Sequence, residues 1–154
     1  MLRGARTVNS EFDHDLGSCS SSLAAAREEL LGVVTALSDD HLDRSRRGGW
    51  TVRRVLEHVI QSEWVYSRLV AHLRGLPVSA DVIDALPAST EDALDRLGAS
   101  RRALLNALDG VDEESFYRLG KIAHEEYSVL SVLENEINHD HEHAEQIRTI
   151  VGIR

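Results

Sequence analysis

Apolar residues recur at helical spacing in four blocks of the chain, and this pattern predicts four amphipathic helices. In the first block, Leu23, Leu30, Val34 and Leu37 fall on one face. The blocks span residues 23–37, 51–74, 89–109 and 128–151. Alternating segments rich in β-branched residues are lacking, which disfavours a strand-rich fold. Four helices that each bury one stripe predict an all-α four-helix bundle.

Residues with capping preferences mark the ends of these blocks. Thr51 is suited to cap the second helix, and Ser89 or Thr90 the third, because a hydroxyl can accept a hydrogen bond from a free N–H of the first turn. Gly75 and Gly110 are suited to end the same two helices. The whole chain, residues 1–154, is expected to form one domain. Its first segment, residues 1–21, is polar and serine-rich, and we expect an irregular or extended lead-in there.

Composition narrows the function classes. The formal net charge is −9, and the only dense basic run, residues 44–47, reads as a solvated loop, so we expect no nucleic-acid partner. No apolar run approaches membrane-spanning length, and the first residues lack the apolar core of a signal peptide. Cys19 is the single cysteine, which excludes an intrachain disulfide. These features predict a soluble cytoplasmic protein without a membrane partner.

Ionisable residues interrupt the apolar stripe of the last block. Both ends of this block keep apolar side chains within about 60° of Val129 in a helical projection. Between these ends, the same stripe carries Glu136, His139, Asp140 and His143. Burying such groups without partners would cost several kcal/mol. We therefore expect a bound cation to balance them.

Two of the three clustered histidines share a face. His139 and His143 lie one helical turn apart, an arrangement common in zinc sites, whereas His141 points toward solvent. His58, at the edge of the stripe in the second block, could complete a face of three nitrogens. The alternative is that the pair binds carboxylates and that His58 is an ordinary core histidine. The remaining histidines lack partners at ligand spacing and are expected on the surface: His14, His41, His72 and His124.

A di-iron carboxylate bundle is a competing interpretation of the same helix. Such bundles use a Glu-x-x-His motif on each of two helices. The chain contains Glu136-x-x-His139 and no second copy of the motif. A paired-metal site would therefore lack half of its ligands.

Two segments of the chain resemble the DinB-like (damage-inducible) metalloproteins. These are "GGWTVRRVLEHVIQSEWVY", residues 48–66, and "INHDHEHAEQIRTIVG", residues 137–152. They carry a Gly-Trp pair, a histidine in the second helix, and a closing His-x-x-x-His followed by Gln-Ile. The resemblance follows the whole chain in helix order and is weaker before residue 22 and between residues 75 and 127.

The resemblance implies a DinB/YfiT-like four-helix bundle with a divalent metal, usually zinc or nickel. Its ligands would be His58, His139 and His143. Characterised members use low-molecular-weight thiols such as mycothiol or bacillithiol in S-transfer or isomerisation, and the N-terminal domains of mycothiol-dependent maleylpyruvate isomerases are related. The Ala- and Arg-rich composition suits a high-GC source, which favours mycothiol.

These observations lead to two expectations about function. The first is a metal-dependent enzyme, a low-molecular-weight-thiol S-transferase or a hydrolase, that acts on a small electrophile with an external thiol. The second is a metal-binding or stress-associated bundle without turnover. Exposed leucines on the first and third helices are compatible with a homodimer.

Several polar and aromatic residues are candidates for the surroundings of the metal. Glu136 and Asp140 are the candidate catalytic residues, as general bases or as acceptors of imidazole N–H groups. Glu63 projects away from its stripe and is expected on the helix surface. Trp50 and Tyr66 could line a pocket, although bundle packing would explain both equally well.

Overall fold

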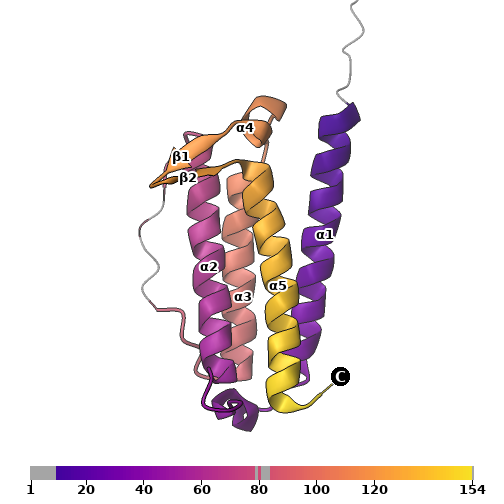
Figure 1. Cartoon of the computed structure of the whole chain (residues 1–154), viewed down its shortest axis with the longest axis vertical. Coiled ribbons are helices and arrows are strands. Elements are labelled where there is room, and N and C mark those ends of the chain that lie inside the picture. The colour runs from indigo at the N-terminus through magenta and orange to yellow at the C-terminus, as the bar shows by residue number, and fades with distance from the viewer. Residues whose placement is uncertain (1–9, 79, 81–83, 154) are drawn as a thin grey trace, which may run out of the picture.

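The computed structural model describes residues 10–78, 80 and 84–153, and it confirms the predicted four-helix bundle. Figure 1 shows four long helices side by side, with α1 and α5 running in one direction and α2 and α3 in the other. The four helices are α1 (Ser10–Thr35), α2 (Val52–Leu73), α3 (Thr90–Leu108) and α5 (Val129–Val151). Among the described residues, no helix is long and apolar enough to cross a membrane.

The helix starts agree with the capping residues in the sequence. The side chains of Thr51, Ser89 and Ser128 each accept a hydrogen bond from the backbone N–H three residues later. Such a cap typically contributes about 1 kcal/mol. α5 ends at Gly152, whose φ of 74° is a left-handed conformation that glycine adopts without strain.

The expectation of an irregular lead-in over residues 1–21 is wrong from Ser10 onward, because α1 begins there. Phe12, Leu16 and Cys19 extend the stripe of Leu23 at helical spacing and pack against one hydrophobic cluster. This packing stabilises a helix in a serine-rich segment whose intrinsic propensity is low. Residues 1–9 lie outside the described part of the chain.

Shorter elements connect the helices. A 3-10 helix, η1 (Asp39–Asp43), follows α1, and a short helix, α4 (Glu113–Tyr117), precedes an antiparallel hairpin of β1 (Gly120–Ile122) and β2 (Glu125–Tyr127). Figure 1 shows α4 and the hairpin over the end of the bundle where α2 finishes and α5 begins. The strands have three residues each, too few for a recognisable alternating pattern.

The core is divided into two hydrophobic clusters. One contains Leu56, Ile60 and Ile147, and the other contains Phe116 and Leu133. Between them lies a set of polar side chains from all four long helices, which we call the charged layer. Its members are Arg27, Glu63, Ser100, Arg101, Glu136 and Asp140.

Candidate metal centre

Three histidines from two helices converge beside the charged layer. The Nε2 atom of His139 lies 2.9 Å from Nε2 of His58 and 3.0 Å from Nε2 of His143. Two nitrogens bound to one tetrahedral zinc at about 2.0–2.1 Å would lie about 3.3 Å apart, so the spacing is close to that of a metal site. Among the described residues, this is the group of histidine, cysteine or acidic side chains that could hold a metal ion.

The electrostatics of the cluster favour neutral imidazoles. Burial, together with the neighbouring His143 and His58, lowers the pKa of His139 to about 4. Burial also lowers the pKa of His58, with smaller contributions from His143 and Arg54. At neutral pH these rings therefore offer lone pairs. A proton on His139 Nε2 can point at one neighbouring nitrogen, whereas a cation among the three rings would satisfy all of them.

Neighbouring side chains orient the rings. His143 Nδ1 lies 2.7 Å from Gln146 Oε1, an acceptor, so Nδ1 carries the proton and Nε2 is left with its lone pair. Trp50 and Tyr66 lie edge-on to the rings of His58 and His139, with centroids 5.2 and 6.1 Å apart. His139 Nδ1 is buried and finds no hydrogen-bond partner among the described residues.

The fourth histidine of the region behaves as expected. The side chain of His141 is 47% exposed and binds Glu29 of α1, with Nδ1 2.6 Å from Oε2. His14, His72 and His124 are exposed, as predicted. His41 is partly buried, and its Nδ1 accepts a hydrogen bond from the backbone N–H of Ser38.

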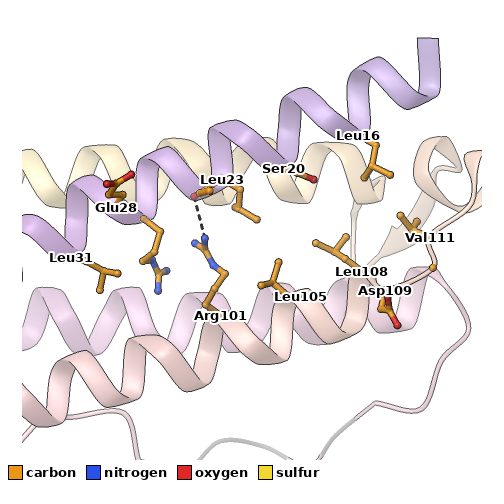
Figure 2. A pocket seen from close by; sticks show the side chains of 13 residues that line it. Leu16, Ser20, Leu23, Glu28, Leu31, Arg101, Leu105, Leu108, Asp109 and Val111 are labelled. Carbon is orange, nitrogen blue, oxygen red and sulfur yellow. Dashed lines mark hydrogen bonds between the residues drawn. The ribbon is translucent and has the colours of Figure 1, made fainter. Parts of the chain in front are cut away.

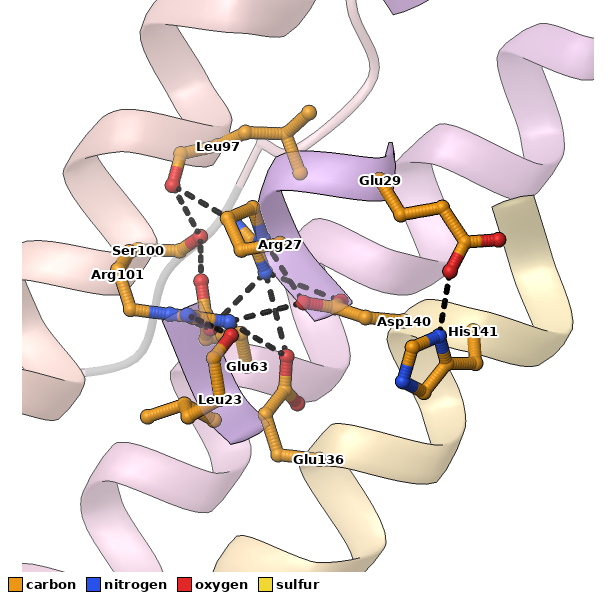
Figure 3. Close-up of polar contacts among 10 residues, drawn as sticks. All are labelled: Leu23, Arg27, Glu29, Glu63, Leu97, Ser100, Arg101, Glu136, Asp140 and His141. Carbon is orange, nitrogen blue, oxygen red and sulfur yellow. Dashed lines mark hydrogen bonds and ion pairs between the residues drawn. The ribbon is translucent and has the colours of Figure 1, made fainter. Parts of the chain in front are cut away.

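The charged layer pairs two arginines with three carboxyl groups (Figure 3). Arg27 Nε lies 2.9 Å from Asp140 Oδ2, and its Nη2 lies 3.0 Å from Glu63 Oε2 and 3.2 Å from Glu136 Oε1. Arg101 contacts Glu63 at 2.7 Å and Asp140 at 2.9 Å. Each arginine thus bridges carboxylates from α2 and α5.

One proton balances the charges of this layer. Burial, and the nearby charges of Glu63 and Asp140, raise the pKa of Glu136 to about 10, so this carboxyl is neutral at physiological pH. Although burial opposes it, the attraction of Glu63 and Asp140 raises the pKa of Arg27 above its ordinary value. Two arginines then face two carboxylates, and the layer has no net charge.

The structure corrects three expectations about these carboxyl groups. Glu63 is fully buried, not on the helix surface, because Arg27 and Arg101 reach it from two other helices. The charges of Glu136 and Asp140 are balanced by arginines, so a cation at the histidines is not needed for them. Their oxygens bind Arg27, and among the described residues neither carboxyl group accepts a hydrogen bond from an imidazole N–H. A catalytic role for Glu136 and Asp140 stays a prediction.

The arginines of the layer are functional neighbours that sequence reasoning missed. Arg27 falls between Leu23 and Leu30 on the stripe of α1, and Arg101 follows Leu97 at the same spacing on α3. A charged residue on the stripe of α1, α3 and α5, and near the stripe of α2, is the signal that could have revealed the layer. A single arginine in a stripe is ambiguous, since its long stem can reach solvent from a core position.

An apolar pocket lies away from the histidines. It occupies about 570 Å³ between α1 and α3, and apolar side chains such as Leu16, Leu105 and Leu108 point into it (Figure 2). Arg27 and Arg101 also line it, so it borders the charged layer. None of the three histidines lines this pocket.

The fold and this site together define the class of protein: a four-helix bundle in which three histidines converge. The family model of the DinB superfamily matches residues 22–147, and the chain therefore belongs to that superfamily. The resemblance noted in the sequence is thus confirmed. A search of curated proteins finds no match.

Solved structures share the fold. The four-helix bundle protein TT2238 is 23% identical, with a TM-score of 0.67, covering 86% of this chain and 96% of that one. A DinB-like protein from Bacillus cereus is 19% identical, with a TM-score of 0.69 and coverage of 91% and 90%. A conserved protein from Enterococcus faecalis is 14% identical, with a TM-score of 0.67 and coverage of 88% and 96%.

Proposed function

We propose that this chain is a divalent-metal-dependent enzyme that activates a low-molecular-weight thiol for transfer to a small electrophile, or that hydrolyses such a compound. The observation that carries the proposal is the convergence of three imidazole Nε2 atoms, two pairs of them 2.9 and 3.0 Å apart. Zinc or nickel suits an all-nitrogen ligand set. Three neutral ligands leave the positive charge of the metal intact and a coordination position open.

The chain's own residues prepare this site. The lowered pKa of His139 keeps its lone pair available at neutral pH, so binding a metal requires no loss of a proton from a cationic ring. Gln146 fixes His143 in the tautomer that directs Nε2 inward. When bound, a divalent metal with an open position lowers the pKa of water and deprotonates a thiol.

The thiol has to come from outside the chain. Cys19 lies on α1 against the hydrophobic cluster that contains Phe116, and it does not belong to the group of His58, His139 and His143 that could hold a metal ion. Burial, with the nearby charges of Glu134 and Asp15, raises the pKa of the Cys19 thiol, which makes it a poor nucleophile. Mycothiol or bacillithiol would be the cosubstrate, and Glu136 and Asp140 remain the candidates for proton transfer.

The compartment and the partners proposed for this enzyme are supported by its composition and its exposed side chains. A lone, partly buried cysteine suits the reducing cytoplasm. The acidic net charge of −9 disfavours nucleic acid and anionic membrane surfaces as partners. Association as a homodimer stays a prediction, supported by exposed leucines such as Leu105 on α3.

Metal analysis of purified protein tests the site. We expect about one equivalent of metal per chain in the wild type, and loss of most of it in His58→Ala and His143→Ala. His141→Ala is a matched control, because this histidine lies on the same helix with its side chain 47% exposed. Wild-type metal content in the first two variants would overturn the proposed ligand set.

Turnover separates catalysis from metal binding alone. An electrophilic bimane probe is offered with mycothiol, bacillithiol or glutathione, with and without a chelator. Chelator-sensitive conjugation that His139→Ala abolishes would support the enzyme. Metal binding without chelator-sensitive conjugation by any of these thiols would favour a metal-binding bundle without turnover.

A further inference from the structure

The apolar pocket between α1 and α3 has no part in the proposed function. Its volume of about 570 Å³ lies within the range of about 300–1,000 Å³ that is typical of small-molecule sites. Its lining includes Leu23, which is only 3% exposed, and Leu105, which is 51% exposed. The pocket therefore reaches from the core of the bundle to its surface.

Small side chains on α1 leave room for this pocket. Ser20 and Ala24 follow Leu16 at successive turns of the helix, so all three lie on the face of α1 that lines the pocket. Leu105 and Leu108 line it from α3 (Figure 2). Because the side chains of Ser20 and Ala24 are too short to fill the space, α1 packs less closely against α3 than against α5. A longer side chain at position 24 would occupy the pocket.

The two arginines that line the pocket are already engaged by the protein. Arg27 donates to the three carboxyl groups of the charged layer and, through Nη1, to Leu97 O at 3.1 Å. Arg101 donates to two of these carboxyl groups and, through Nη1, to Leu23 O at 3.1 Å, the contact drawn in Figure 2. An anionic ligand would have to displace these partners, so the arginines disfavour anions rather than attract them.

The charges at the two ends of the pocket are negative. Glu28 and Asp109 are exposed lining residues, and Figure 2 shows them toward opposite ends. Glu28 forms no ion pair with any described residue, and Arg74 binds the backbone oxygen of Asp109 at 2.9 Å and not its carboxylate. Each end therefore offers a carboxylate whose charge a ligand can balance. The net charge of −9 adds a long-range attraction for cations.

We propose that this pocket is a binding site for a small amphipathic cation, with an aliphatic or aromatic body between the leucines and an ammonium group beside Glu28 or Asp109. The site is separate from the three histidines and does not depend on the function proposed for them. A second copy of the chain fits this face less well. In a symmetric dimer it would bring its own Glu28 and Asp109, and its own net charge of −9, against the same carboxylates.

Competition binding to the full-length protein tests this inference. The reporter is N-phenyl-1-naphthylamine, an uncharged dye that fluoresces in apolar surroundings. The competitors are decyltrimethylammonium, 1-decanol and decanoate, which differ mainly in the charge of the head group and are kept below the concentrations at which they aggregate. We expect the cation to displace the dye at a concentration about 10-fold lower than decanoate, with decanol between them. Added salt should reduce this preference, because it screens the exposed carboxylates.

Filling the pocket locates the binding. Ala24→Phe should raise the Kd of the dye and of the cation by at least about 10-fold, because the new ring takes the place of the ligand. Ala25→Phe is the matched control, at an exposed neighbouring position outside the lining, and should leave both Kd values within about 2-fold of the wild type. Unchanged binding in Ala24→Phe, or a wild type that binds neither the dye nor the cation, would overturn the inference.

A second variant tests the charge without altering the packing. Glu28→Gln combined with Asp109→Asn, both at exposed positions, should raise the Kd of the cation by about 5-fold and leave that of decanol within about 2-fold. Glu142→Gln, an exposed carboxylate outside the pocket, is the control and should change neither. An unchanged Kd of the cation in the double variant would contradict its placement. Light scattering that shows a dimer split by Ala24→Phe, with no displacement of the dye by the cation, would assign this face to a second copy instead.

Discussion

The residues of the candidate metal centre and of the charged layer alternate along the same turns of α5, yet the two sets of buried polar groups are balanced in different ways. In the layer, Arg27 and Arg101 face Glu63 and Asp140, and Glu136 holds a proton, so every charge has a partner within the chain. In the centre, three imidazole nitrogens face one another. The charges of the layer balance within the chain, although Glu136 Oε2 finds no hydrogen-bond partner among the described residues, whereas the centre brings together ring nitrogens that a cation could share.

This difference assigns a structural role to the charged layer and a ligand-binding role to the three histidines. A buried charge set that is balanced internally needs nothing from solution, and removing one member leaves the others unpaired. A cluster of lone pairs gains stability only from something added. Sequence position alone would not distinguish the two, since Asp140 directly follows His139.

The largest effect is expected from breaking the layer. Arg27→Met would leave buried carboxylates without their central cation and should cost about 3–5 kcal/mol of unfolding free energy, measured by urea denaturation. Arg148→Met is the matched control, because Arg148 pairs with Glu29 on the surface, where ion pairs contribute little. Equal losses in the two variants would show that the layer is not the stabilising unit described here.

An intermediate effect is expected from filling the centre. Zinc at 100 times its Kd should raise the unfolding free energy by about 2.7 kcal/mol, because it binds the folded state alone. His139→Ala should abolish this gain and His141→Ala should keep it, as measured by thermal denaturation with and without zinc. A gain that survives in His139→Ala would place the zinc elsewhere.

The smallest effect is expected from pH. Since the pKa of His139 is lowered to about 4, the metal-free folded state does not take up the proton that the unfolded state binds below about pH 6.5. The stabilisation is present above pH 6.5 and is lost as the pH falls toward 4. For this partly buried ring we expect a loss of about 1 kcal/mol between pH 7 and pH 5.

The control for this pH dependence is His139→Ala. The raised pKa of Glu136 gives the opposite slope, because the folded state holds that proton where the unfolded state releases it. This contribution is shared by the wild type and the variant, so it cancels in the difference between them. An identical pH dependence in both proteins would contradict the lowered pKa of His139.

Much of the fold could be predicted from the sequence, because helix ends depend on local chemistry. Thr51, Ser89 and Ser128 cap helices through hydrogen bonds to residues three positions away, which a sequence displays directly. The start of α1 at Ser10 could not be predicted in this way. It depends on contacts between Phe12 and the distant Phe116, whose ring centroids lie 5.4 Å apart.

The histidines of the candidate site could be predicted from the sequence, but the partners of its neighbouring carboxyl groups could not. The spacing of His139 and His143 and the stripe-edge position of His58 were visible, and the structure brings these three rings together. The partners of Glu136 and Asp140 were not visible, because Arg27 is more than 100 positions away in the chain. Which helix packs beside which is not encoded in the period of one helix, so pairs of charges across helices stay hidden until the bundle is assembled.

The charged layer also limits how far one helix can slide along another. A shift of α5 by a single turn, about 5.4 Å, would place one of its two carboxyl groups where the other lies now and bring an apolar residue to the vacated position beside the arginines. Hydrophobic surfaces alone penalise such slippage weakly, since one leucine replaces another. The arginine contacts therefore fix the axial register of the helices. The same register keeps His58 of α2 level with the two histidines of α5 before any ligand binds.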